Sequence, residues 1–254
     1  MRIAFIYKYF PSLGGAERVM TVLANEFVEK GVEIVIYSFQ QELDQPAYLL
    51  DKAISILPLP DKRKIASSMN VDYLSNDLIK NEISILLNHD TISDSMLLCK
   101  KVKEKTGIPL ITLHHGQIYL PYSSLFSIVC IKQGFNIRKA LFPLYYLYVL
   151  VRECLHHKKN IRICDAYVVL SSSFQRQLGS SSKIQAIGNP LSYSSFFDMS
   201  QYDKKENVVV MVGRISEFHK RFSLALKIWQ KIETNPAFSS WNFEIVGDGS
   251  DLAI

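Results

Sequence analysis

Three short stretches of the sequence carry residue types that can do chemistry: Gly14-Gly15, His114-His115, and Arg214 with Lys220. Paired glycines let a ligand approach the backbone closely. An imidazole donates, accepts or transfers a proton near neutral pH. An arginine fork and a lysine point charge that converge on one turn can neutralise a diphosphate. The positions of these residues depend on the strands and helices around them.

The glycine pair lies inside a βαβ pattern that spans the first forty residues. Arg2–Tyr7 and Val32–Tyr37 are nearly continuous apolar runs, typical of parallel strands covered on both faces. Between them, apolar residues recur at helical spacing, and Gly31 ends the helix. Ligands of such units bind beyond the carboxyl ends of the strands, where a helix N-terminus favours a phosphate. A simple tight turn at Gly14-Gly15 is the competing interpretation. The sequence lacks G-x-G-x-x-G, which argues against a dehydrogenase.

The histidine pair closes a predicted strand, Pro109–Leu113. We therefore expect it at the carboxyl edge of the sheet, beside the glycine loop. There His114 or His115 could hydrogen-bond a sugar or polarise a reacting group. Two surface histidines at a strand end are an equally good interpretation. A metal site is less favoured, because no cysteine or carboxylate accompanies the pair at ligand spacing.

Strands and helices alternate through the rest of the first 190 residues, which predicts a doubly wound, parallel α/β sheet. The predicted strands are 54–57, 83–88, 165–171 and 183–187, and the predicted helices are 62–80, 93–105 and 172–178.

A second βαβ pattern begins at residue 208. Val208–Val212 is predicted to be a buried strand, and a helix carrying Phe222, Ala225, Trp229 and Ile232 on one face leads to the strand 243–246. Arg214 and Lys220 flank the loop after the first of these strands. Two unrelated surface cations are the alternative, but the repeated strand, loop and helix favour a phosphate site.

Residues 118–162 are unusually apolar and basic. Their cations are Lys132, Arg138, Lys139, Arg152, Lys158, Lys159 and Arg162. Aromatic residues beside such cations suit a lipid headgroup interface, which makes attachment to the inner membrane surface a hypothesis. A core helix beginning near Pro143 is the simpler interpretation of the piece 144–151.

The amino-acid composition limits the classes of protein to which the chain can belong. The chain has 254 residues, 48% of them hydrophobic and 21% charged, with a net charge of +5, all typical of a globular protein. Four cysteines without a C-x-x-C pair indicate a reduced, cytoplasmic protein. We expect no secretory signal and no membrane-spanning helix. We also expect no nucleic-acid partner, because no recognised module is present.

Taken together, these residues resemble glycosyltransferase family 4, the bacterial group 1 enzymes of capsule, O-antigen and exopolysaccharide synthesis, which have the GT-B fold. The resemblance covers nearly the whole chain, and its specificity comes from the order and spacing of several motifs. These are Gly14-Gly15-Ala16-Glu17-Arg18, the stretch 165–171, Gly188-Asn189-Pro190, Val212-Gly213-Arg214, Lys220-Arg221-Phe222 and Val246-Gly247-Asp248-Gly249.

The resemblance implies an α/β architecture with two Rossmann-like domains. We expect residues 1–190 to form the N-terminal, acceptor-side domain, residues 191–207 a linker, and residues 208–254 the start of the domain that binds a nucleotide-sugar. It also implies transfer of a sugar, with retention of configuration, from a nucleotide diphosphate sugar to a lipid-linked or polysaccharide acceptor. No metal or other cofactor is expected.

Site roles carry over by position in the same way. The implied donor-binding residues are Gly14, Gly15, Gly213, Arg214 and Lys220. Arg214 and Lys220 would stabilise the leaving nucleotide electrostatically. The implied catalytic residue is His115, or failing it His114, in contact with the transferred sugar.

The sequence departs from the family at one feature. The family carries two glutamates in the spacing E-x7-E, well downstream of the loop 247–249, and no such pair follows here. We therefore expect a C-terminally truncated member. An inactive remnant that binds only membrane or nucleotide-sugar is the alternative function, and a related α/β enzyme such as a sugar epimerase is a third.

Overall fold

The structure is a computed structural model and describes residues 1–130, 137–193, 196–249 and 251. The chain divides into two compact units, Met1–Ser194 and Ser195–Ile254, called unit 1 and unit 2 below.

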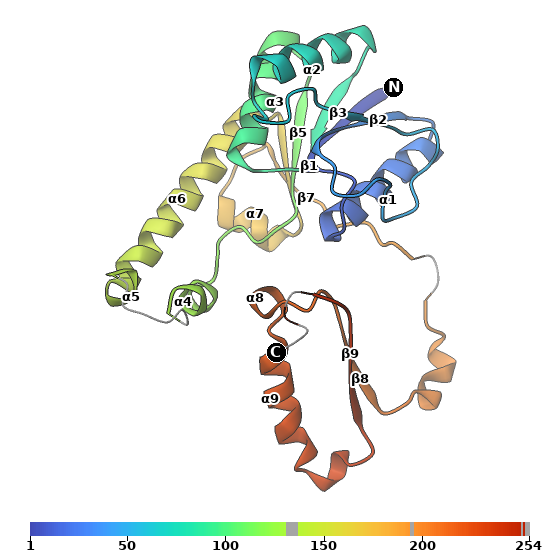
Figure 1. Cartoon of the computed structure of the whole chain (residues 1–254), viewed down its shortest axis with the longest axis vertical. Helices are drawn as coiled ribbons and strands as arrows, with labels where there is room; N and C mark the ends of the chain where they lie inside the picture. Colours follow the sequence, from blue (N-terminus) through green and yellow to red (C-terminus); the bar gives the residue numbers. More distant parts are fainter. Residues whose placement is uncertain (131–136, 194–195, 250, 252–254) are drawn as a thin grey trace. The chain divides into compact units, whose positions relative to one another are not determined.

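Unit 1 is built on a parallel sheet of seven strands in the order β3-β2-β1-β4-β5-β6-β7 (Figure 1). The strands are β1 (Arg2–Tyr9), β2 (Glu33–Gln40), β3 (Ser55–Pro58), β4 (Ile85–Asn88), β5 (Leu110–His114), β6 (Ala166–Val169) and β7 (Ile184–Ala186). The register pairs Ile3 with Ile34 on one side and with Ile85 on the other. Each predicted strand of this unit is present, with small shifts at its ends.

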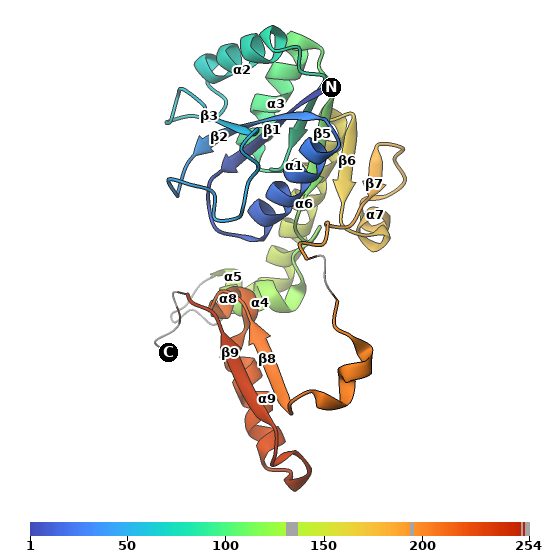
Figure 2. The same cartoon turned by 90° about the vertical axis from the view of Figure 1, so that its right-hand side faces the viewer.

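Helices cover both faces of the sheet (Figure 2). They include α1 (Gly15–Glu29), α2 (Ser68–Lys80), α3 (Ser93–Thr106) and α7 (Ser172–Leu178). Successive side chains of a strand point to opposite faces. Ala4 and Ile6 of β1 therefore pack in the core with α2 and α3, while Ile3 and Phe5 pack in a second core with α1.

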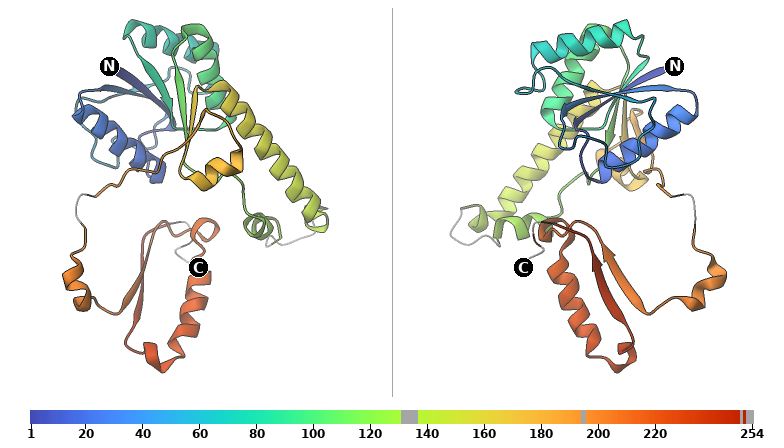
Figure 3. Two further views of the ribbon diagram at one scale, coloured as in Figure 1. Left: turned by 180° about the vertical axis from the view of Figure 1, so that it is seen from behind. Right: turned by 45° about the vertical axis from the view of Figure 1, so that its right-hand side comes forward.

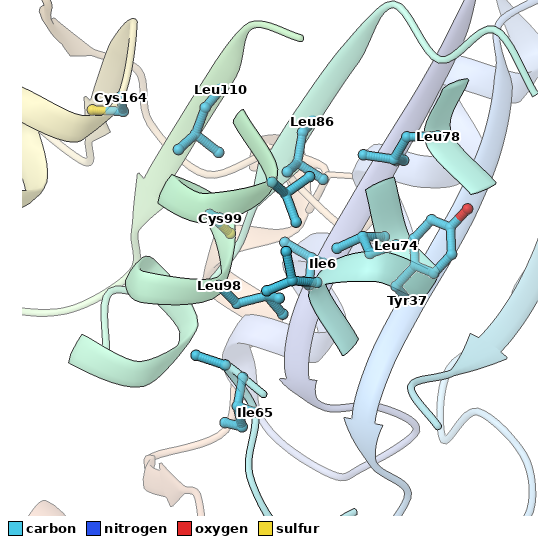
Figure 4. Close-up of a cluster of buried hydrophobic side chains, with 14 of the residues drawn as sticks. Ile6, Tyr37, Ile65, Leu74, Leu78, Leu86, Leu98, Cys99, Leu110 and Cys164 are labelled. Carbon is cyan, nitrogen blue, oxygen red and sulfur yellow. The ribbon is translucent and has the colours of Figure 1, made fainter. Parts of the chain in front are cut away.

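In the larger core, the apolar faces of α2 and α3 pack against the sheet. Leu74 and Leu78 of α2 lie near Tyr37 of β2, and Leu98 of α3 faces the same interior (Figure 4). All four side chains are fully buried. Burying one such aliphatic side chain stabilises the fold by about 1.5–3 kcal/mol. This double covering confirms the predicted doubly wound α/β class.

The described part of the stretch 118–162 contributes to three helices, α4 (Tyr122–Cys130), α5 (Ile137–Ala140) and α6 (Phe142–Ile163) (Figure 3). Pro143 lies in the first turn of α6, where its missing N–H costs nothing, so the predicted helix start is confirmed. Phe142 packs edge-on against Tyr122 and Phe126, with ring centroids 4.9 and 5.1 Å away, in a small separate core. Lys132 lies outside the described residues.

The predicted helix 62–80 is partly wrong, because α2 begins only at Ser68. The side chain of Asp61 accepts hydrogen bonds from the backbone of Arg63 and Lys64, which turns the chain away from a helix. The buried side chain of Asn70 then binds the loop backbone at Asp61, Lys64 and Ile65. Ser67 caps the helix by accepting from the Asn70 amide.

Unit 2 contains a βαβ unit preceded by a 3₁₀ helix, η1 (Met199–Lys204), within the stretch predicted to be irregular. Strands β8 (Val208–Val212) and β9 (Asn242–Val246) are parallel, and α8 (Glu217–Lys220), α9 (Phe222–Glu233) and η2 (Pro236–Phe238) lie between them in the sequence. Trp229 of α9 stacks on Phe243 of β9 at 5.4 Å.

The prediction that Val208–Val212 is buried is wrong. Val210 is 51% exposed and Val212 is 70% exposed. The reason is that the described part of unit 2 contains a sheet of only two strands, whose residues have few neighbours to cover them. The strand itself forms because its β-branched residues favour extended backbone.

Candidate functional site

The order of strands in unit 1 locates a binding edge. From β1 the chain proceeds to β2 and β3 on one side, and it returns to place β4 on the other side of β1. Loops after β1 and β4 therefore diverge at the carboxyl edge, which is where doubly wound sheets bind ligands. The loop after β1 contains Gly14 and Gly15, and the loop after β4 begins with His89.

Gly14 and Gly15 differ in what a side chain at each position would contact. Gly14 is the N-cap of α1 and is extended, with φ of −177°, so its backbone imposes no special conformation. A Cβ at Gly14 would instead run into the carboxylate of Glu17. A Cβ at Gly15 would meet no atom within 4 Å, so the space beside Gly15 is open. A ligand can approach the backbone at Gly15 without a clash.

Glu17 is a part of this edge that our sequence reasoning passed over. Its side chain is buried and accepts a hydrogen bond from the Ser12 hydroxyl at 2.8 Å. The hydroxyl of Tyr7 also hydrogen-bonds to it, and burial together with Glu17 raises the pKa of that tyrosine. The Glu17 carboxylate therefore places a negative charge of the chain itself in the first turn of α1, where the helix dipole favours one. Its position three residues after the N-cap was the available signal.

His115 lies at the same edge, after β5. Its ring stacks on that of His89, with centroids 5.3 Å apart and planes at 8°, and its Nε2 lies 3.1 Å from Nδ1 of His89. Burial first, and then the neighbouring His114, lowers the pKa of His115 to about 4, although Glu17 acts in the opposite direction. His115 is therefore neutral at pH 7 and offers one donor and one acceptor.

His89 is the second residue that sequence reasoning missed. It follows β4 as His115 follows β5, and neighbouring parallel strands end side by side. The side chain is only 2% exposed, and its ring lies 4.8 Å from that of Phe5. Burial, followed by the nearby His115, lowers the pKa of His89 well below its usual value.

His114 points elsewhere, because adjacent strand residues alternate in direction. Its Nδ1 lies 3.3 Å from the Thr91 hydroxyl, and its Nε2 lies 3.0 Å from the Gln117 carbonyl oxygen. The ring meets His157 of α6 edge-on at 5.0 Å. Burial lowers the pKa of His114. Of the two candidates, His115 is the one grouped with His89 and influenced by the charge of Glu17.

The C-terminal half of α6 fixes the loops behind these histidines. His157 bridges the Ile118 carbonyl at 2.9 Å and the Tyr167 hydroxyl at 3.0 Å. Asn160 donates to the Thr91 carbonyl at 3.0 Å. The loops after β4 and β5 are therefore attached to one helix, which holds the edge in a defined shape.

The remaining predicted site residues lie in unit 2. Gly213 has φ of 156°, and a Cβ there would lie 3.4 Å from Cε of Lys220, so the lysine side chain lies beside this loop. The loop is fixed because Gly213 N–H donates to the Val246 carbonyl at 3.0 Å. Arg214 follows on the same loop and is exposed. The structure thus groups Gly14, Gly15 and His115 in unit 1, and Gly213, Arg214 and Lys220 in unit 2.

Two further properties of the described residues concern metal binding and membrane crossing. In this part of the chain, no group of three or more histidine, cysteine or acidic side chains is arranged to hold a metal ion. Each described helix is too short or too polar to cross a bilayer.

Solved structures with a similar fold include glycosyltransferases. The lipopolysaccharide outer core galactosyltransferase WaaB superposes with a TM-score of 0.63 at 20% identity, over 99% of this chain and 62% of WaaB. TarM of S. aureus, crystallised with UDP, gives a TM-score of 0.62 at 10% identity, over 98% of this chain and 72% of TarM. HepE of Anabaena, in complex with UDP and glucose, gives a TM-score of 0.56 at 14% identity, over 98% of this chain and 61% of HepE.

These likenesses show that the fold is GT-B, and that the chain spans about three fifths of the length of WaaB and HepE. No curated protein matches the sequence. The family profile that matches is Glycosyltransferase Family 4, over residues 13–192, which is most of the chain and includes both Gly14-Gly15 and His114-His115. The protein therefore belongs to glycosyltransferase family 4.

Proposed function

We propose that the protein transfers a sugar from a nucleotide diphosphate sugar to a hydroxyl group of a lipid-linked or polysaccharide acceptor, with retention of configuration, in cell-surface polysaccharide synthesis. The observation that carries the proposal is family membership combined with a carboxyl edge that holds Gly15, Glu17 and His115 at the switch point of the sheet. HepE and TarM, which share the fold, were crystallised with UDP, which supports a nucleotide diphosphate donor.

The roles of the residues follow from their chemistry. Neutral His115 contacts the transferred sugar, and the open backbone at Gly15 allows the donor to approach. Lys220 and Arg214 hold the diphosphate and stabilise the negative charge that develops on the leaving nucleotide. No metal ion is needed in this scheme, so treatment with a chelator should leave transfer unchanged.

Calorimetry with uridine and guanosine diphosphate sugars, combined with an assay for released nucleotide in the presence of bacterial membranes, tests this proposal. We expect Lys220→Ala to weaken donor binding at least tenfold, about 1.4 kcal/mol, because an ammonium that pairs with phosphate is lost. Lys231→Ala is the control, since Lys231 is an exposed cation at the far end of α9.

Three outcomes are informative. Normal turnover by Lys220→Ala would contradict the role of this lysine. Binding without turnover would favour the alternative function, a remnant that binds nucleotide-sugar without transferring it. If none of the donors bound, both functions would be excluded for this chain.

We also propose that unit 1 contacts the inner face of the cell membrane, which would make the protein cytoplasmic and peripheral. The support is one face of α6. Leu144, Leu147, Tyr148, Val151 and Leu155 recur at helical spacing and are each at least half exposed. The same face continues with Lys158, Lys159 and Arg162, all exposed. Apolar insertion followed by cations suits anionic lipid, and hence a lipid-linked acceptor.

A further inference from the structure

We infer that Glu217 is the positioning residue of Lys220. Its carboxylate binds Ser223 and so holds the turn at Arg221 that keeps the lysine beside Gly213. All of these residues belong to unit 2, where α8 lies between the end of β8 and the start of α9 (Figure 1). The inference rests on the proposed function only in that Lys220 is taken as a residue that holds the diphosphate.

The turn between α8 and α9 has an unusual backbone. Arg221 has φ of 52° and ψ of 49°, a left-handed conformation that costs an arginine free energy and a glycine very little. Arg221 ends α8 and is also the N-cap of α9. A residue other than glycine stays in this region only where its surroundings hold it there. The contacts across Arg221 therefore need to be identified.

The side chain of Glu217 makes these contacts. The backbone N–H of Ser223 donates to Oε2 of Glu217 at 2.9 Å, and the Ser223 hydroxyl donates to Oε1. The two bonds lower the pKa of Glu217, which is therefore charged at pH 7. Hydrogen bonds to a charged acceptor are stronger than those between neutral groups. Another conformation of Arg221 would carry Ser223 away and break both bonds, so the carboxylate favours the left-handed one.

The backbone of Glu217 is fixed to the loop after β9. Its N–H donates to Oδ2 of Asp251 at 2.7 Å, and the N–H of Ile215 donates to the Asp248 carbonyl at 2.8 Å. A Cβ at Gly249 would lie only 2.1 Å from the Ile215 carbonyl oxygen, so the two loops are in backbone contact. The carboxylate thus extends from a fixed point to the first turn of α9.

Lys220 depends on this turn, because α8 has only four residues. One turn of helix is not stable by itself, so α8 keeps its shape only while its ends are held. In that shape the N–H of Lys220 donates to the Ser216 carbonyl at 2.8 Å. Its Cε, Cδ and Cγ lie 3.4, 3.8 and 3.9 Å from the position of a Cβ on Gly213. A lysine held in place before the ligand arrives loses less conformational freedom on binding.

Charge alone predicts the opposite effect of removing Glu217. Its carboxylate is a negative charge three residues from Lys220, in the region proposed to hold a diphosphate. Like charges repel, so loss of the carboxylate by itself should strengthen the binding of an anion. Positioning predicts weaker binding instead. The sign of the change in Kd therefore distinguishes the two effects.

NMR spectra of the isotope-labelled 254-residue protein measure the turn without any ligand. The amide and α protons of Arg221 come close together only at positive φ, so we expect a strong NOE between them. We also expect NOEs between the side chain of Lys220 and Gly213. Glu217→Ala should lose both signals. Adding Arg221→Gly should restore the contacts of Lys220, because glycine adopts positive φ freely. Unchanged NOEs in Glu217→Ala would overturn the inference.

Calorimetry with UDP and with inorganic pyrophosphate measures the effect on binding. We expect Glu217→Ala to raise Kd roughly fivefold, because Lys220 is no longer held in advance. Glu217→Gln keeps an acceptor for Ser223 and should bind at least as tightly as wild type. Glu206→Ala removes an exposed carboxylate outside the turn and should bind as wild type does. Tighter binding by Glu217→Ala would contradict a positioning role.

Two double variants test whether the effect passes through the lysine. In a Lys220→Ala background, Glu217→Ala should cause no further loss, because residues that act through one contact are not additive. Arg221→Gly should bring the Kd of Glu217→Ala back to that of Arg221→Gly alone. Additive losses, or no recovery, would show that Glu217 acts by another route.

Failure of the proposed function gives a different result from failure of this inference. If wild-type protein binds neither UDP nor pyrophosphate, the donor role of Lys220 is refuted, and the NOEs alone decide whether Glu217 positions it. If Glu217→Ala unfolds unit 2, Ser223→Ala removes only the hydroxyl bond and should weaken the same NOEs in a folded protein. Ser223→Ala with unchanged NOEs would then contradict the inference.

Discussion

At the scale of single residues, the histidines of unit 1 are the feature with the clearest consequences. Burial lowers the pKa of His89, His114, His115 and His157, so all four are neutral inside the fold at pH 7. In the unfolded chain each would bind a proton near its ordinary pKa of about 6.5. Between that value and the lower folded value, the unfolded state binds more protons than the folded state. Stability must therefore fall as the pH falls through this window.

We expect His115→Gln to reduce this loss of folding stability at acid pH. The pKa of His115 is lowered to about 4, so its share between pH 7 and pH 4 is on the order of 3 kcal/mol of unfolding free energy. Urea unfolding at several pH values measures the change. Met69→Ala, at an exposed position of α2, should keep the wild-type slope. An unchanged slope in His115→Gln would show that the pKa of His115 is not lowered in the folded protein.

At the scale of elements, α2 shows how one buried amide decides where a helix begins. Asn70 is fully buried, and its side-chain NH₂ donates to the carbonyls of Asp61, Lys64 and Ile65 at 2.9, 3.1 and 3.0 Å. We expect Asn70→Ala to destabilise unit 1 by about 2–4 kcal/mol, because these carbonyls lose their partner in the interior.

Thermal and urea unfolding measure this prediction. Met69→Ala is the matched control at the neighbouring position, where the side chain is 58% exposed, and it should change stability by less than about 0.5 kcal/mol. Equal effects of the two substitutions would mean that the loop 61–67 is not held by Asn70.

The exposed face of α6 gives the second prediction at this scale. We expect the double variant Leu144→Ser and Leu147→Ser to sediment less with vesicles rich in anionic lipid, because two side chains that are 64% and 56% exposed lose their apolar surface. Met69→Ser with Ile79→Ser on α2 is the control, with similar exposure on another helix. If wild-type protein stays in the supernatant at low salt, the membrane proposal is wrong.

At the scale of the whole molecule, the stretch between β7 and β8 separates two compact units. Its aromatic residues Tyr193, Phe196, Phe197 and Tyr202 are all at least half exposed. Proteases cut exposed segments of low local stability before packed elements. We expect limited chymotrypsin digestion to cut first within 193–202 and to leave unit 1 as a stable fragment.

Mass spectrometry of the early fragments checks this prediction. The variant Phe196→Ser with Phe197→Ser should slow the first cut, while the fragment pattern within unit 1 stays the same. A first cut inside the seven-stranded sheet would instead show that unit 1 is the less stable of the two.

How much the sequence predicts depends on whether a property is local. The strands of the main sheet and α1, α3 and α7 follow from apolar spacing and from glycines such as Gly31 and Gly107, both with positive φ. The start of α2 does not, because a buried asparagine binding a loop leaves no periodic signal. The exposure of β8 could not be predicted either, since a strand sequence does not state how many neighbours the strand has.

For the candidate site, the sequence located the loops but not all the partners. The sequence ranks His115 before His114 only by resemblance, whereas strand alternation places the two side chains in different surroundings. His89 and Glu17 were missed because each contact joins separate elements, after β4 and β5 or across the first turn of α1. Such contacts depend on the register of the sheet rather than on the spacing of any motif.

The two halves of α6 have different surroundings, and this limits how its length can change. The helix has 22 residues, about 33 Å. Its second half is bound to the loops through His157 and Asn160, and its first half carries the exposed apolar face. One residue inserted between the halves would turn that face by about 100° relative to the loops. An insertion of seven residues would nearly restore the phase. In homologues, α6 should therefore vary in length by whole pairs of turns.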